Sequence, residues 1–272
     1  QAENSLGLPA GASIEAKRVD LIFRPFQALS GETRLSELVI VQGKVRVHSE
    51  SSRFAGTQTT PLGWEQIFNL PMDGISLLQT QVEFSSVSPA VNVSFLAESF
   101  AIRLRRTRAS GPAYEVSAHL RQLSSTVTHD AIQSLKCEAH ISMAGFEVAE
   151  SELEMAGLKL FGTGGLKGDL LGAKALPFDG NLRFEAKPAE LMPTLKKLEL
   201  AEQVQKWLRP QGVLSGDISF SGDARKAAAG LKAKSRVLGQ DLGIREWEIA
   251  KLSWEGAWDA EKRLLLNERA VF

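Results

Sequence analysis

The chain has 272 residues, and its 43% hydrophobic and 24% charged content is ordinary for a folded protein and excludes a disordered tail. Its 32 basic and 32 acidic residues give a formal net charge of zero, so no overall field attracts nucleic acid or anionic lipid. The single cysteine, Cys137, excludes an internal disulfide and a cysteine-rich metal cluster. No stretch approaches the roughly 20 consecutive apolar residues of a membrane-spanning helix.

Short apolar runs and alternating segments predict strands through the first 160 residues. Residues 114–121 show the pattern most clearly, because apolar and polar side chains alternate there as in a strand with one covered face. Gln42 and Gly43 predict a bulge or a tight turn between two strands. No long helical pattern interrupts residues 75–160, which favours an antiparallel meander with local connections. The expected strands are residues 19–23, 38–41, 45–47, 75–83, 91–96, 100–106, 114–120, 135–143, 146–154 and 158–161.

Two segments predict helices. A short helix is expected at residues 62–68, next to Pro61, and a longer one at residues 189–208, where Leu191 and Leu195 belong to an apolar stripe with helical spacing. The longer helix is expected to lie across the sheet or at one of its ends. Strands then resume at residues 213–221, 231–238, 245–254 and 263–267.

The residues that could carry chemistry do not form a recognisable site. The glycine-rich residues 162–168 lack the ending of a phosphate-binding loop and a following helix, and they predict a flexible hairpin connection. His119 and His140 could meet across strands, but two ligands make a poor zinc site. Cys137 lies within a predicted strand, where a thiolate is not stabilised. The sequence therefore predicts no catalytic residue, metal or cofactor, and a protein that is not an enzyme.

Two further clusters have a structural and a functional interpretation. The arginines of residues 103–108 predict a solvated strand face, with contact to lipid headgroups or nucleic-acid phosphates as the less favoured interpretation. Trp247, Trp254 and Trp258 cluster near the end of the sequence. Of this region, Leu252, Trp254 and Trp258 share strand parity and predict a core cap, or else an aromatic rim at an apolar groove.

Two segments near the start of the chain, residues 18–31 and 35–47, resemble the N-terminal signature of the AsmA-like family of bacterial envelope proteins. Leu70 and Pro71 precede the next strand as in that family, and residues 180–222 are similar to its later repeat. The resemblance implies a groove-like sheet in the periplasm and a parent protein anchored in the inner membrane. It also implies a role in moving phospholipid toward the outer membrane, and it carries over no catalytic residues.

We therefore expect a mainly β protein, an elongated and twisted antiparallel sheet that forms a groove or half-pipe, with one main amphipathic helix and one short helix. Residues 1–272 are expected to form a single elongated domain, with an optional sub-boundary near residues 162–180. Because the sequence begins at Gln1 without an initiator methionine or a signal region, we also expect it to be a piece of a longer, membrane-anchored protein.

The expected function is non-enzymatic binding or conduction of phospholipid between the inner and outer membranes, in support of outer-membrane integrity. A strand face left open would shelter acyl chains at about 0.8 kcal/mol per buried CH₂. Expected partners are phospholipid acyl chains and membrane proteins at the two ends, and not nucleic acid. The alternatives are a scaffold that offers its sheet edge to an outer-membrane protein, and an enzyme or carbohydrate-binding module on a β-sandwich.

The residues expected to line a lipid groove are apolar and share strand parity, which is equally the pattern of an ordinary core. They are Phe100, Ile102, Leu104, Val116, Ala118, Leu120, Ile141, Leu182, Phe184, Ile218 and Phe220.

Overall fold

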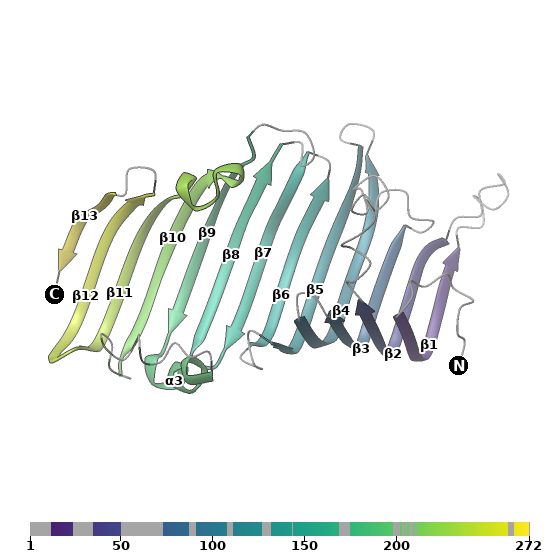
Figure 1. The fold of residues 1–272 in the computed structure, drawn as a ribbon, viewed down its shortest axis with the longest axis horizontal. Helices are drawn as coiled ribbons and strands as arrows, with labels where there is room; N and C mark the ends of the chain where they lie inside the picture. Colours follow the sequence, from purple (N-terminus) through teal and green to yellow (C-terminus); the bar gives the residue numbers. More distant parts are fainter. Residues whose placement is uncertain are drawn as a thin grey trace. The chain divides into compact units, whose positions relative to one another are not determined.

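The computed structural model describes residues 12–23, 35–49, 73–86, 91–107, 111–126, 132–142, 144–168, 175–197, 202, 204, 206, 209, 211–260 and 264–271. The chain divides into two compact units, Gln1–Asp130 and Ala131–Phe272, and each is described by itself. Both consist mainly of long strands that form open, twisted sheet (Figure 1). The mainly β class is thus confirmed.

The first unit contains five described strands that lie side by side in chain order (Figure 1). They are β1 (Ala12–Phe23), β2 (Leu35–Ser49), β3 (Gly74–Ser86), β4 (Val91–Thr107) and β5 (Gly111–Ser125). The β1–β2, β3–β4 and β4–β5 pairs are antiparallel.

The β2–β3 pair is parallel, so the expectation of a wholly antiparallel sheet is wrong at this position. Leu38 lies opposite Ile75, and Val47 lies opposite Phe84. A parallel pair needs a connection of a dozen or more residues, and residues 50–73 supply that length. Alternation within a strand reports which face is covered but not the direction of the neighbour. The short helix expected at residues 62–68 lies outside the described residues.

Two breaks expected in this unit are irregularities inside continuous strands. Gln42 in β2 and Gln79 in β3 have φ values of 51° and 49°, and the β2–β3 register brings them side by side. A left-handed residue shifts the parity of the alternation, so Leu38 and Ile40 before Gln42 lie on the same face of β2 as Val45 and Val47 after it. The tight-turn alternative at Gln42 is therefore wrong. The two strands expected at 91–96 and 100–106 are likewise one strand, β4, with register shifts near its middle.

The second unit contains eight described strands, again side by side in chain order and with every adjacent pair antiparallel (Figure 1). They are β6 (Ile132–Ser142), β7 (Gly145–Met155), β8 (Leu158–Lys167), β9 (Pro177–Ala186), β10 (Val213–Asp223), β11 (Lys232–Ile244), β12 (Trp247–Asp259) and β13 (Leu264–Val271).

The glycine-rich segment is part of strand β8, so its interpretation as a hairpin connection is wrong. Gly164 pairs with Val148 on one side and with Gly180 on the other. Backbone hydrogen bonds to two neighbours hold a strand that glycine alone would disfavour. The segment that was expected to hold a sub-boundary, residues 162–180, lies within this second unit and includes the β8–β9 pairs from Gly164–Gly180 to Leu166–Phe178.

The described part of the expected long helix is shorter than residues 189–208. Helix α3 spans Pro188–Lys197, and Glu202 and Val204 are also helical. A Cβ atom on Gly157, in the β7–β8 turn, would lie 2.4 Å from the Leu191 nitrogen. Helix α3 therefore packs at the end of these strands, as Figure 1 shows. A 3₁₀ helix, η2 (Ala224–Gly230), follows β10 and was not expected.

Candidate functional site

In the first unit, the groove candidates lie together on one face of strands β4 and β5. Phe100 is opposite Ala118, and Ile102 is opposite Val116. Leu104 and Leu120 are buried and the other four are half-buried. The candidates of this unit are Phe100, Ile102, Leu104, Val116, Ala118 and Leu120.

The same apolar face continues onto β3 and β2. Leu77 is opposite Phe100, and Ile75 is opposite Ile102. Ile40 on β2 is buried beside Leu77, whereas Phe84 near the end of β3 is 37% exposed. The sequence prediction found only part of this face, because it identified strands singly and could not place β2 next to β3.

In the second unit, the remaining five candidates also share a face. Leu182 is opposite Ile218, and Phe184 and Phe220 lie on the same side of β9 and β10. Ile141 on β6 is opposite Phe146 on β7, which is 38% exposed. The row continues through Leu166 on β8 to Phe178 on β9, so Ile141 lies on the same face as Leu182. The candidates of this unit are half-buried and comprise Ile141, Leu182, Phe184, Ile218 and Phe220.

Aromatic rings on this face lie against glycines of the neighbouring strand. A Cβ on Gly180 would meet the Phe220 ring at 2.5 Å, and one on Gly216 would meet the Phe184 ring at 2.8 Å. Phe178 takes the same place next to Gly222. Each ring fills the space that a missing side chain leaves, so rings and aliphatic side chains together form the apolar surface of this face.

Two tryptophans extend the face onto strand β12. Trp254 is opposite Val237, and Trp258, which is 38% exposed, is opposite Ala233. Trp247 begins β12 and is 67% exposed, so it is no core residue. Leu252, Trp254 and Trp258 lie on one face of β12, as their parity predicts.

In the part of the chain that the structure describes, the extensive contacts join neighbouring strands, with η2 against β10 as the one addition. No described helix or second sheet makes comparable contacts across the apolar face of either unit.

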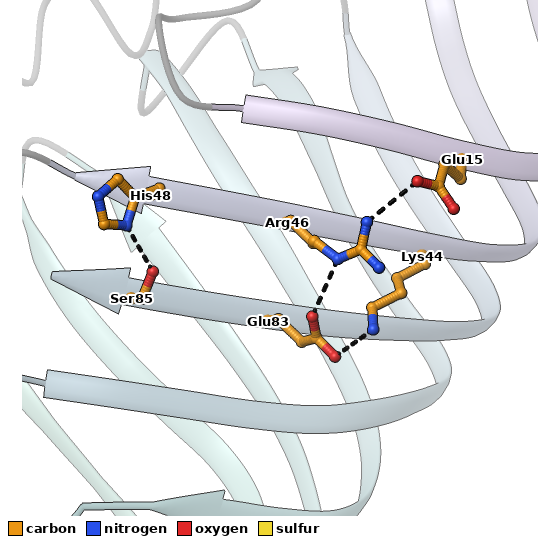
Figure 2. Close-up of polar contacts among 6 residues, drawn as sticks. All are labelled: Glu15, Lys44, Arg46, His48, Glu83 and Ser85. Atoms are coloured by element: carbon orange, nitrogen blue, oxygen red, sulfur yellow. Dashed lines mark hydrogen bonds and ion pairs between the residues drawn. The ribbon is translucent and has the colours of Figure 1, made fainter. Parts of the chain in front are cut away.

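The opposite face carries ion pairs. In the first unit, Arg46 Nη1 lies 3.0 Å from Glu15 Oε1, and Glu83 lies 3.2 Å from Arg46 Nε and 2.5 Å from Lys44 Nζ (Figure 2). The hydrogen bond from Lys44 is the main cause that lowers the pKa of Glu83, and Arg46 adds to it. These side chains are largely solvent-accessible, so water and salt screen the pairs and each adds little to stability.

Further along the same face, the Nδ1 atom of His48 lies 2.8 Å from Ser85 Oγ (Figure 2). Both residues line an open hollow of about 650 Å³, together with Asn92 and Ser94. These side chains belong to the polar face, so this hollow is not the expected apolar groove.

The polar face of the second unit also carries paired charges. Arg183 Nε lies 3.1 Å from Asp217 Oδ1, and Arg236 Nε lies 3.3 Å from Glu255 Oε1. Asp217 is opposite Arg236 in the β10–β11 register. Positive and negative side chains thus alternate across four strands.

An open groove of about 820 Å³ lies on this polar face, across strands β7 to β12. On β9 and β10 its lining includes polar-face side chains on either side of an apolar-face residue, namely Asn181 and Arg183 around Leu182, and Asp217 and Ser219 around Ile218. A second hollow of about 500 Å³ shares Asn181, Ser219 and Lys234 with it. On the polar face of this unit, short polar side chains alternate with long charged ones and leave hollows between them. On the apolar face, aromatic rings fill the corresponding space.

The remaining residues considered for chemistry show no activated group. Burial, followed by the nearby Glu138, raises the pKa of the Cys137 thiol, which opposes thiolate formation. The carboxylate of Glu98 lies 3.0 Å from His119 Nδ1 and 2.9 Å from Arg121 Nε. Among the described residues, no group of three potential ligands could hold a metal ion. The helices that the structure describes include none with the length and hydropathy to cross a membrane.

The fold and the two faces define a class: a mainly β protein of open, twisted sheet, with one apolar and one polar face in each unit. Comparison with known protein families, with curated proteins and with solved structures finds no match for this chain.

Proposed function

We propose that the apolar face binds the acyl chains of phospholipid and that the protein is a non-enzymatic, lipid-conducting part of a bacterial envelope protein. The observation that carries the proposal is the broad, half-buried apolar face, which no described element covers in either unit. The resemblance to the AsmA-like family supports a periplasmic location and an inner-membrane anchor outside this chain. Membrane proteins at the two ends would be its partners.

Acyl chains suit this surface because it is continuous and has little polar content. Ile218 and Leu182 form a cross-strand pair, and the rings of Phe184 and Phe220 lie beside them over glycines. Each CH₂ group that leaves water contributes about 0.8 kcal/mol, so a chain in contact over several residues gains several kcal/mol. Ion pairs on the other face keep that side in water.

The second candidate function is a scaffold that adds a strand from another protein to its edge. Strand β1 pairs with β2 and, among the described strands, with no other. It exposes Val19, Leu21 and Phe23, at 44%, 47% and 58%. An exposed apolar edge strand is a template for β-augmentation.

Native mass spectrometry of gently purified protein, followed by titration with a fluorescent phospholipid, tests the acyl-chain proposal. The proposal predicts co-purifying phospholipid and saturable binding. Ile218→Asp, on the apolar face, should weaken binding about tenfold or more, whereas Ser221→Asp, on the opposite face of the same strand, should leave it unchanged. A protein without lipid that also fails to bind the probe would overturn the proposal.

A further inference from the structure

Strand β11 presents three cations in a row on the polar face of the second unit. Lys232, Lys234 and Arg236 occupy alternate positions, which places all three side chains on the same side of the sheet. Their surroundings can be compared directly, because β10 and β12 flank β11 in continuous antiparallel register.

The outer two cations each have an acidic partner on β12. Lys232 Nζ lies 3.8 Å from Asp259, and Arg236 Nε lies 3.3 Å from Glu255. On β10, the acid opposite Arg236 is Asp217, which Arg183 already binds. The register thus supplies compensating charge at both ends of the row.

Lys234 differs from both neighbours. Its opposite residues are Ser219 on β10 and Ala257 on β12, so neither adjacent strand places an acid in its row. No acid among the described residues forms an ion pair with its ammonium group. The residue lines both hollows of the polar face, where the three N–H donors of an ammonium are open to a ligand.

The row that contains Lys234 continues across the sheet with uncharged hydrogen-bonding side chains. Ser219 is opposite Asn181 on β9, and Asn181 is opposite Thr163 on β8. Phe161 lies on the same side of β8, two residues before Thr163, and also lines the larger groove. Neighbouring strands are about 4.8 Å apart, so the row from Thr163 to Lys234 is about 14 Å long.

From this arrangement we propose that the polar groove binds a phosphate group attached to a polyhydroxylated body, such as a sugar. Lys234 and Ser219, on adjacent strands, bind the phosphate oxygens. The row is too long for a phosphate alone, so Asn181 and Thr163 bind hydroxyl groups of the attached sugar, and Phe161 packs against its apolar face. Arg236 and Lys232 stay in their ion pairs and add a favourable field.

This site is independent of the acyl-chain proposal, because it lies on the opposite face of the sheet. A phosphorylated polyol can be a free metabolite or the headgroup of a lipid. Glucose 6-phosphate is the probe for the free form, and phosphatidylcholine vesicles with or without phosphatidylinositol are the probe for the lipid form.

Calorimetric titration of the whole chain with glucose 6-phosphate, inorganic phosphate and glucose tests the site. Binding should be tightest for glucose 6-phosphate, and Lys234→Gln should weaken it about tenfold or more. Asn181→Ala should weaken binding of glucose 6-phosphate and leave that of inorganic phosphate unchanged. The matched control is Lys136→Gln, which removes an equal charge from the same face but from an ammonium paired with Glu152 at 2.8 Å.

A response of the phosphatidylinositol vesicles alone, lost in Lys234→Gln, would support the site and assign it to a lipid headgroup. The proposal is overturned if neither probe binds, or if Lys234→Gln and Lys136→Gln bind equally well. Equal affinity for inorganic phosphate and glucose 6-phosphate would overturn the role given to Asn181 and Thr163.

Discussion

The ring of Phe220 lies against the backbone of Gly180 on the neighbouring strand, in the space where any other residue would have its Cβ. That Cβ would fall 2.5 Å from the ring and 2.7 Å from the carbonyl oxygen of Thr163. Phe184 and Gly216 repeat the relationship on the same pair of strands four residues along, with the ring on β9 and the glycine on β10. Glycine and aromatic residues together thus build an apolar face within a single layer of sheet.

Gly180→Ala should therefore lower the free energy of unfolding by about 1–3 kcal/mol, because the ring and a backbone carbonyl must both move. Urea denaturation measures the change. Asn181→Ala, the adjacent exposed position, is the control and should stay within about 0.5 kcal/mol of the wild type. A Gly180→Ala protein as stable as the control would show that the ring does not need this space.

The left-handed conformation of Gln42 makes a second prediction. A β-branched residue is strained at φ 51°, whereas glycine is not, so Gln42→Val should lower the free energy of unfolding by about 1–2 kcal/mol. Gln42→Gly should leave it unchanged or raise it by up to about 1 kcal/mol. Thermal denaturation compares the two variants, and equal stability of both would contradict the assigned backbone.

The cluster around Glu83 predicts a pH dependence. Hydrogen bonding from Lys44, with a smaller contribution from Arg46, lowers the pKa of Glu83 below its usual value. A carboxyl with a lowered pKa in the folded state stabilises the fold above its unfolded pKa of about 4.3, and this contribution is lost as the pH falls through the folded value.

Carboxyl NMR titration tests this directly. Lys44→Ala should raise the pKa of Glu83 toward its usual value, whereas Lys159→Ala in the other unit should leave it unchanged. If Glu83 titrates identically in the wild type and in Lys44→Ala, the ion pair is not formed in solution.

Asp223 joins the end of β10 to the segment before β9. Its carboxylate accepts hydrogen bonds from the backbone nitrogens of Leu176 at 2.9 Å and Arg225 at 3.0 Å, and these bonds lower its pKa. Stability from this carboxylate should be present above about pH 4 and lost as the pH falls below it. Asp223→Asn keeps an acceptor oxygen but removes the titrating group. The free energy of unfolding of this variant should therefore fall less steeply below about pH 4, as measured by denaturation at several pH values. An unchanged profile would contradict the assignment.

Sequence alternation located the strands because each one has an apolar and a polar face. It failed where the backbone changes parity. Strand β4 was expected as two pieces because the alternation breaks near Glu98, yet the register shifts there and Glu98 binds His119 and Arg121 on the next strand. The glycines of β8 have no side chains to alternate, so only their pairing with Val148 and Gly180 reveals a strand.

Alternation also predicted the apolar half of the candidate site. Residues of one parity within β4, β5, β9 and β10 were selected, and in the structure they share a face. The polar groove was not predictable. Lys234 is distinctive only through its opposite residues, Ser219 and Ala257, and they lie 15 and 23 positions away in a register that alternation does not encode. The parallel β2–β3 pairing escaped prediction in the same way.

Photo-crosslinking at two adjacent residues tests the central claim most directly. A benzophenone amino acid at position 182 replaces Leu182 on the apolar face, and the same group at position 183 replaces Arg183 on the polar face. After delivery of radiolabelled phospholipid, the account predicts strong crosslinking to acyl chains from position 182 and little from position 183. Equal labelling at both positions, or none at position 182, would contradict an acyl-chain surface on this face.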